Sequence, residues 1–142
     1  MADAVLVTTA GLTIITNALL NPGGVGVAVA PKWAQWGVGS SSAPAAGDTD
    51  LEDKTGATET PRVNNDYAVA TTTLTDDTVS AGALITCNAT GKAIVEVGLF
   101  NAEGAGAPVT GNTMFLRATF SAINLVAGNS IDFTIDTKFV PV

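Results

Sequence analysis

Side chains that branch at Cβ set the strongest constraint on how this chain can fold. The sequence holds 15 Val, 7 Ile and 20 Thr, which occupy 42 of its 142 positions. These side chains have few χ1 rotamers and pack well on the pleated, half-buried surface of a β-sheet. An all-β fold is therefore the first expectation, and at this length one domain covering 1–142 is the second.

A repeat of two in the apolar residues predicts where the strands lie. Gly, Asn, Asp and Thr clusters separate the apolar runs, as turns between strands require. In the last run, Ile131, Phe133 and Ile135 alternate with Asp132 and Asp136, which predicts an apolar face turned inward and acids turned outward. One or two strands are expected over 25–29 and 33–38, which Pro31 separates, and further strands near 65–75, 83–88, 92–100, 113–120 and 131–140.

Two of these strands can be aligned with each other from the sequence. If 92–100 pairs antiparallel with 113–120 so that paired numbers sum to 213, Val95, Val97 and Leu99 face Ala118, Leu116 and Met114. The other face then places Glu96 opposite Arg117, a structural pair worth about 0.2–1 kcal/mol if it is exposed. Catalysis by this pair would need a second titrating group nearby, and the sequence indicates none.

A helix is expected near the N-terminus, before the repeat changes to two. Leu12, Ile15 and Leu19 recur at spacings of three and four, and Thr8 or Thr9 is a suitable cap. Residues 21–24 (NPGG) then stop the helix. The 1–24 segment is either a core element or an arm that reaches a neighbouring molecule.

Residues 39–61 predict a long surface loop. They are dense in Gly, Ser, Pro, Asp and Thr, and Leu51 is their one bulky apolar side chain, a candidate contact residue or an anchor onto the sheet. Asp48, Asp50 and Glu52, with Glu59 further on, imitate the ligand spacing of a calcium loop. Asp53 stands where that loop needs glycine, so a solvated acidic loop is preferred and no metal or cofactor is expected.

Composition excludes several classes of function. The net charge is −7, and the six Lys and Arg residues are scattered singly, so no basic stripe is available for nucleic acid. The absence of histidine removes triads, Cys-His pairs and the usual zinc sites. The single cysteine, Cys87, cannot form an internal disulfide. A non-enzymatic protein follows as the expectation.

The sequence also predicts a protein made in a cytoplasm and not held in a membrane. No run reaches the ~18 apolar residues of a membrane span, and the first residues lack the positive flank of a signal peptide.

Trp33 and Trp36 are the remaining candidate contact residues. Exposed tryptophans stack on sugar rings or on partner chains. In a strand, residues three apart point to opposite faces, which favours one ring in the core and one at a sheet edge or subunit contact. Carbohydrate binding by either ring is kept as an alternative.

The order of segments resembles that of tailed-bacteriophage capsid decoration (cement) proteins. An apolar N-terminal helix is followed by an aromatic-glycine step at 33–39 (WAQWGVG) and by a loop that closes on Asp50, Leu51 and Glu52. The segments 95–101 (VEVGLFN) and 114–120 (MFLRATF) come next, then a closing strand after 126–130 (VAGNS). The resemblance spans nearly the whole chain.

This resemblance implies an antiparallel β-sandwich, jelly-roll-like, with a short N-terminal helix. It implies a homotrimer on the capsid surface, assembled in the host cytoplasm, that bridges subunits of the major capsid protein. Related patterns occur in phage tail, baseplate and fibre components, which remain the alternative. The 39–61 loop departs from the pattern because it lacks aromatic anchors.

Overall fold

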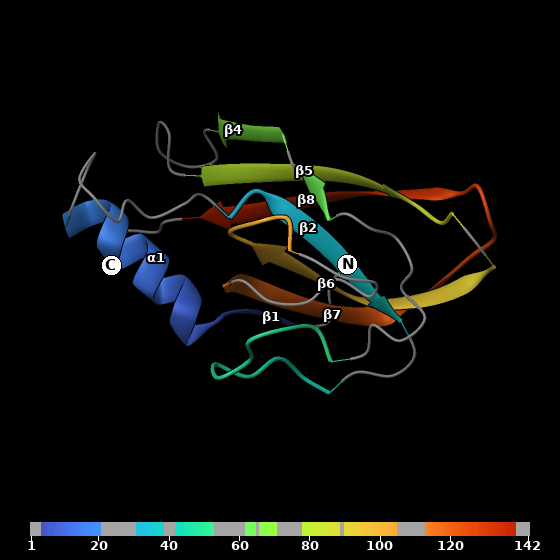
Figure 1. The fold of residues 1–142 in the computed structure, drawn as a ribbon, viewed down its shortest axis with the longest axis horizontal. Coiled ribbons are helices and arrows are strands. Elements are labelled where there is room, and N and C mark those ends of the chain that lie inside the picture. The colour runs from blue at the N-terminus through green and yellow to red at the C-terminus, as the bar shows by residue number, and fades with distance from the viewer. Residues whose placement is uncertain are drawn as a thin grey trace.

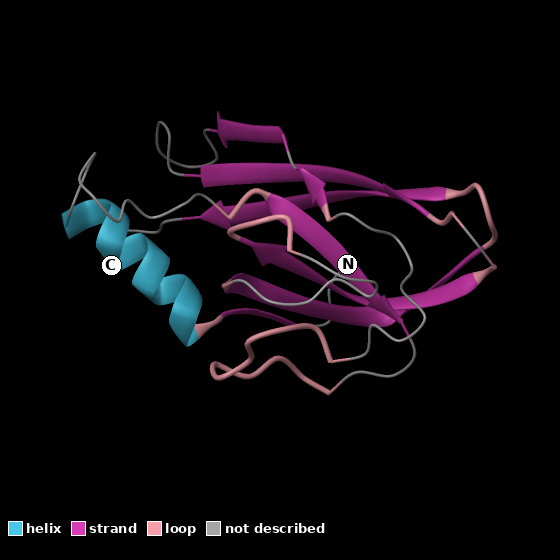
Figure 2. Cartoon of the chain, in the orientation of Figure 1, coloured by secondary structure: helices cyan, strands magenta, loops and turns pink. Residues whose placement is uncertain are grey.

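The structure, a computed structural model, is an antiparallel β-sandwich with one helix near the N-terminus (Figures 1 and 2). This fold confirms the predicted class. The structure describes residues 4–20, 31–38, 42–52, 62–64, 66–70, 78–88, 90–104 and 113–138.

Two sheets form the sandwich, and every strand pair in them is antiparallel. Sheet A has five strands, in the spatial order β1 (Ala4–Val7), β7 (Met114–Leu125), β6 (Lys92–Phe100), β2 (Trp33–Val38) and β3 (Val63–Asn64). Sheet B has three strands, in the order β4 (Asp66–Ala70), β5 (Thr78–Thr86) and β8 (Ser130–Lys138).

The main core lies between the two sheets. Apart from Cys87, which directly follows β5, its buried members come from β2, β5, β6 and β7, where alternate residues of a strand point to the same face. Ile131, Phe133 and Ile135 of β8 pack against this core, while Asp132 and Asp136 are exposed. The inward and outward faces predicted for the last strand are therefore confirmed.

Helix α1 (Thr9–Leu20) lies at one end of the sandwich and packs on β7. Thr8 is its N-cap, because the Gly11 N–H donates to Thr8 Oγ1 at 3.0 Å and the Leu12 N–H donates to the Thr8 carbonyl at 3.0 Å. The Thr8 N–H in turn donates to the carbonyl of Phe115 in β7 at 2.9 Å. Leu12, one of the residues that defined the predicted helical repeat, is 55% exposed.

The remaining predicted strands agree only in part with the strands of the structure. The 33–38 and 92–100 strands are confirmed at the predicted bounds, and β7 continues five residues past 120, to Leu125. β1 was not predicted, because its four residues show no alternation of polar and apolar side chains. Its pairing with β7 makes Ala4–Val7 an edge strand of sheet A. The predicted 25–29 strand and the 71–75 end of another lie outside the described residues.

The predicted register of β6 and β7 is wrong by two residues. Val97 lies opposite Ala118, Leu99 opposite Leu116, and the paired numbers sum to 215 through this stretch. A shift of two keeps every side chain on its face, so the apolar pattern alone cannot distinguish the two registers. Irregularities between Ile94 and Glu96 and between Leu99 and Phe100 change the register again at both ends of this stretch.

The connection that follows β5 and the turn between β7 and β8 are joined by backbone hydrogen bonds. The Cys87 N–H donates to the Asn129 carbonyl at 2.8 Å, and the Gly128 N–H donates to the Cys87 carbonyl at 2.7 Å. Gly128 has φ of +87°, a left-handed conformation that favours glycine. These bonds fix the turn between β7 and β8, at the end opposite α1 (Figure 1).

Candidate functional site: a loop bound to sheet A by two arginines

The face of sheet A turned away from sheet B carries a buried guanidinium, that of Arg117. Glu96 lies opposite Thr119, and Arg117 lies opposite Gly98, so Glu96 and Arg117 are diagonal neighbours on this face. Arg117 Nε and Glu96 Oε2 are 2.6 Å apart. Glu96 is 0% exposed and Arg117 is 2% exposed. The predicted directly opposite pair is thus corrected to a diagonal one, and the pair is buried.

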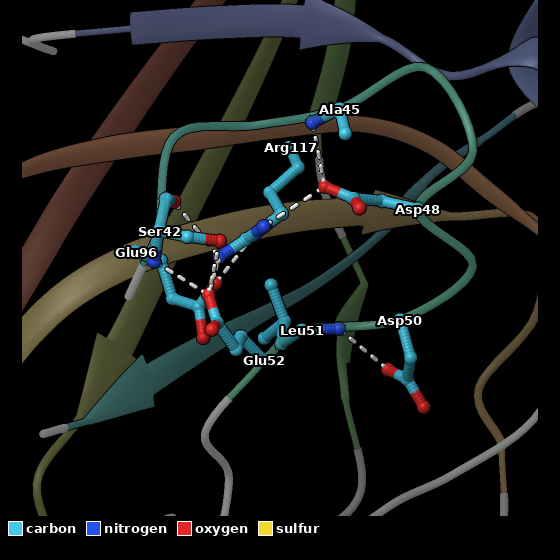
Figure 3. Close-up of polar contacts among 8 residues, drawn as sticks. All are labelled: Ser42, Ala45, Asp48, Asp50, Leu51, Glu52, Glu96 and Arg117. Atoms are coloured by element: carbon cyan, nitrogen blue, oxygen red, sulfur yellow. Dashed lines mark hydrogen bonds and ion pairs between the residues drawn. The ribbon is translucent and has the colours of Figure 1, made fainter. Parts of the chain in front are cut away.

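Arg117 also binds the loop that crosses this face (Figure 3). Its Nη1 donates to Asp48 Oδ2 at 2.8 Å, and its Nη2 donates to Glu52 Oε2 at 2.9 Å. Nη2 also donates to the Ser42 carbonyl at 3.3 Å. One planar guanidinium therefore joins a strand carboxylate to two loop carboxylates, a use for which its fork of donors is suited.

The loop, residues 42–52, holds a fixed shape through its own hydrogen bonds. The Ser42 N–H and hydroxyl both donate to Glu52 Oε2, the hydroxyl at 2.8 Å. The Ala45 N–H donates to Asp48 Oδ2 at 2.9 Å. The loop is also tied to the start of α1, because the Thr9 N–H donates to the Ala46 carbonyl at 2.7 Å. The described part of the predicted 39–61 loop thus contains no helix or strand, but hydrogen bonds within it and to α1 hold its conformation.

Leu51 anchors the loop to the sheet by an apolar contact. It is 4% exposed and forms a second small core with Phe100 and Met114, against which Trp33 packs. A Cβ at Gly98 would lie 3.0 Å from Leu51 Cδ2, so glycine leaves the room that this side chain occupies. The structure therefore places Leu51 under the loop, facing the sheet.

A second buried arginine, Arg62, lies on the same face. Its Nε donates to Gln35 Oε1 at 3.0 Å, and its Nη1 donates to the Ala102 carbonyl at 3.2 Å. Its guanidinium carbon lies 3.5 Å from the centre of the Phe100 ring, a cation–π contact. Its Nη2 is 3.7 Å from Asp50 Oδ1 of the loop. The loop carboxylates thus face two arginines, Asp48 and Glu52 toward one and Asp50 toward the other.

These contacts shift the pKa values of the groups involved. Hydrogen bonds from the Ser42 N–H and hydroxyl, and then from Arg117, lower the pKa of Glu52 below its ordinary value of 4.5. Burial works to lower the pKa of Arg117, but its bonds to Asp48, Glu96 and Glu52 outweigh burial and raise it. Burial also lowers the pKa of Arg62, and the negative charge of Asp50 partly offsets this lowering.

The calcium-loop spacing has a structural use instead. Asp48, Asp50 and Glu52 are the three loop carboxylates directed at the arginines, whereas Asp53 and Glu59 lie outside the described residues. Within the described ranges, no group of three or more His, Cys, Asp or Glu side chains is arranged to hold a metal ion. The repeat of acids was visible in the sequence. Its arginine partners could not be identified there, because they lie up to 69 residues away along the chain.

The two tryptophans lie on opposite faces of β2, as strand geometry requires. Trp36 is 1% exposed in the core between the sheets, and Trp33 is partly buried against the small core of Leu51, Phe100 and Met114. Trp36 therefore offers no surface for a sugar ring. The pairing of Arg62 with Gln35 was missed from the sequence, because Arg62 belongs to no motif and Gln35 was read only as part of the aromatic-glycine step at 33–39.

Acidification should weaken the attachment of the loop. Because the pKa of Glu52 is lowered in the folded protein, its contribution to stability is complete above its unfolded value of 4.5 and is lost as the pH falls through the folded value. The free energies of unfolding of the wild type and Glu52→Gln should therefore differ at neutral pH and converge below pH 4.5. Urea denaturation at stepped pH measures this.

Glu103→Gln is the matched control, since Glu103 is exposed and belongs to no contact described for the loop. It should follow the wild type at every pH. A difference between wild type and Glu52→Gln that persisted unchanged at pH 3 would contradict the ionic attachment.

Among the described helices, none is long and apolar enough to cross a membrane. Comparison of the chain with protein-family models, with curated proteins and with solved structures found no match.

Proposed function

We propose that the chain is a virion structural protein without enzymatic activity, a capsid decoration (cement) protein of a tailed bacteriophage. It binds as a homotrimer and stabilises the head by bridging subunits of the major capsid protein. It contacts neither nucleic acid nor membrane, and it is added to the capsid surface during assembly in the host cytoplasm.

The observation that carries this proposal is that the separate motifs behind the resemblance form one packing unit. Trp33 of the aromatic-glycine step packs against the small core that Leu51 of the loop forms with Phe100 and Met114. Glu52 of the loop binds Arg117 of the 114–120 segment. Arg117 binds Glu96 of the 95–101 segment. Segments that only followed one another in sequence are therefore joined at a single place on sheet A.

A rigid surface of this kind suits a protein that stabilises a shell. Ordering a loop at the moment of binding costs conformational entropy, and a loop already fixed by ion pairs and by Leu51 avoids that cost. A decoration protein also contacts several subunits at once, so weak individual contacts combine through avidity. The net charge of −7 keeps a crowded particle soluble.

The proposal is tested first by light scattering and then by co-sedimentation with phage heads that lack the protein. We expect a solution mass of three times the 14.2 kDa chain, and saturation of heads at a fixed ratio. Heads carrying the protein should also withstand heating better than bare heads.

Each alternative gives a different result. A monomer that ignores heads and sediments with tails would assign the protein to a tail, baseplate or fibre component. A protein that binds neither, but is retained on a carbohydrate matrix, would overturn the structural role in favour of sugar binding.

A further inference from the structure

An open groove separates β7 from β8. These strands are consecutive in the chain, joined by the turn at 126–129, yet β7 belongs to sheet A and β8 to sheet B. The space between them is about 600 Å³. Its apolar lining includes Val5, Phe120, Ile123, Ile131, Phe133 and Ile135. Among the residues that the structure describes, the sandwich is therefore open along this side, with part of its apolar interior accessible.

One wall of the groove is the edge of a sheet. β8 pairs with β5 on one side, and within the described part of the chain no strand pairs with its other side. An edge strand presents backbone N–H and C=O groups that can pair with a further strand. β8 has nine residues, and the six from Ile131 to Asp136 that line the groove would extend for about 20 Å.

The edge also carries charge of one sign beside the groove. Asp132 and Asp136 line it and are exposed, on the face of β8 opposite to its isoleucines and phenylalanine. A strand added to β8 would place alternate side chains into the apolar groove and the others beside these two carboxylates. Side chains of opposite charge across two paired strands stabilise the pair, and like charges destabilise it.

We propose that the groove is a docking site for an extended segment of a partner protein in which apolar residues alternate with Lys or Arg. The segment adds to the free edge of β8, its apolar side chains enter the space above Phe120 and Ile123, and its basic side chains meet Asp132 and Asp136. The backbone supplies affinity and the alternation supplies specificity.

The same charges disfavour a second copy of this chain as the occupant. Antiparallel pairing of two β8 strands about Thr134 places Asp132 of each copy opposite Asp136 of the other. Both facing pairs are then acidic, which is unfavourable. A basic segment meets no such conflict.

The test uses the full chain and a labelled peptide probe, Lys-Val-Lys-Val-Lys-Val with blocked ends, followed by fluorescence anisotropy. The control peptide has the same residues in block order, Lys-Lys-Lys-Val-Val-Val, and so the same charge. We expect the alternating peptide to bind about tenfold more tightly than the control. Only the alternating peptide can place its valines in the groove and its lysines beside the carboxylates of β8 at the same time.

Two matched variants locate the binding. Ile123 is 41% exposed in the groove, and Leu12 is 55% exposed on α1, away from it. Ile123→Lys should weaken binding of the alternating peptide by about tenfold, whereas Leu12→Lys, with the same change of charge, should leave it unchanged. Circular dichroism spectra that match the wild type show that both variants are folded.

Equal affinity for the two peptides would overturn the proposal, since attraction to net charge would then explain binding. Loss of binding in both variants, or in neither, would overturn it as well. So would a solution mass that falls in Ile123→Lys alone, because the groove would then be a contact between copies of the chain. The peptide assay needs no phage heads, so its failure and that of the decoration role are distinguishable.

Discussion

Arg117→Met is expected to lower the free energy of unfolding by about 3–5 kcal/mol. The substitution leaves Glu96 in a site where its side chain is 0% exposed, without the guanidinium 2.6 Å away that balances its charge. It also removes the hydrogen bonds that hold Asp48 and Glu52. In a domain of 142 residues this loss corresponds to a fall in Tm on the order of 10 °C. Urea denaturation followed by tryptophan fluorescence measures it.

The controls separate the buried charge from the lost packing. Arg117→Met combined with Glu96→Gln removes the charge and should recover a substantial part of the loss. Lys32→Met removes an exposed cation and should change stability by no more than about 0.5 kcal/mol. If the double variant were no more stable than Arg117→Met alone, the uncompensated carboxylate would not be the cause.

Gly11→Ala is expected to destabilise the protein by about 1–3 kcal/mol, although it replaces glycine within a helix. Replacing glycine by alanine in a helix interior normally raises the stability of the folded state by about 1 kcal/mol. At this position a Cβ would collide with the carbonyl oxygen of Phe115, a backbone atom of β7 that cannot turn aside. Helix α1 would therefore have to move off the sheet. Thermal unfolding of the variant measures the effect.

Gly82→Ala is the matched control for this result. Gly82 lies in β5, and a Cβ there would meet no atom within 4 Å. Its replacement should leave stability unchanged or raise it by about 0.5–1 kcal/mol. A rise in Tm for Gly11→Ala similar to that for Gly82→Ala would show that α1 is not seated closely on β7.

Local patterns were enough to predict much of the fold. Apolar alternation located the strands at 33–38 and 92–100. The place of Thr8 and Thr9 before a helical repeat narrowed the cap to these two residues, and the structure shows that it is Thr8. The inward face of β8 followed from its regular alternation. Each of these features depends on residues close together in the chain, where sequence patterns carry information.

What could not be predicted depends on pairing between distant residues. The register of β6 and β7 was wrong by two because Leu116 and Met114 are equally apolar partners for Leu99. The spacing of the loop acids was visible in the sequence, but their binding partner was not. Arg117 is separated from Asp48 and Glu52 by 69 and 65 residues in the chain. Arg62 gave no signal at all, because its partners Gln35 and Ala102 lie in separate segments.

The anchoring of the loop has a consequence for its resistance to proteases. Exposed segments without helix or strand are the usual sites of cleavage, because a protease must draw an extended stretch of chain into its cleft. Here Asp48, Leu51 and Glu52 attach the loop to sheet A at points three or fewer residues apart. No extended stretch can leave the surface without breaking those contacts together. Cleavage within residues 48–52 therefore requires local unfolding first, and a segment that looks vulnerable in sequence is protected while the sheet beneath it is intact.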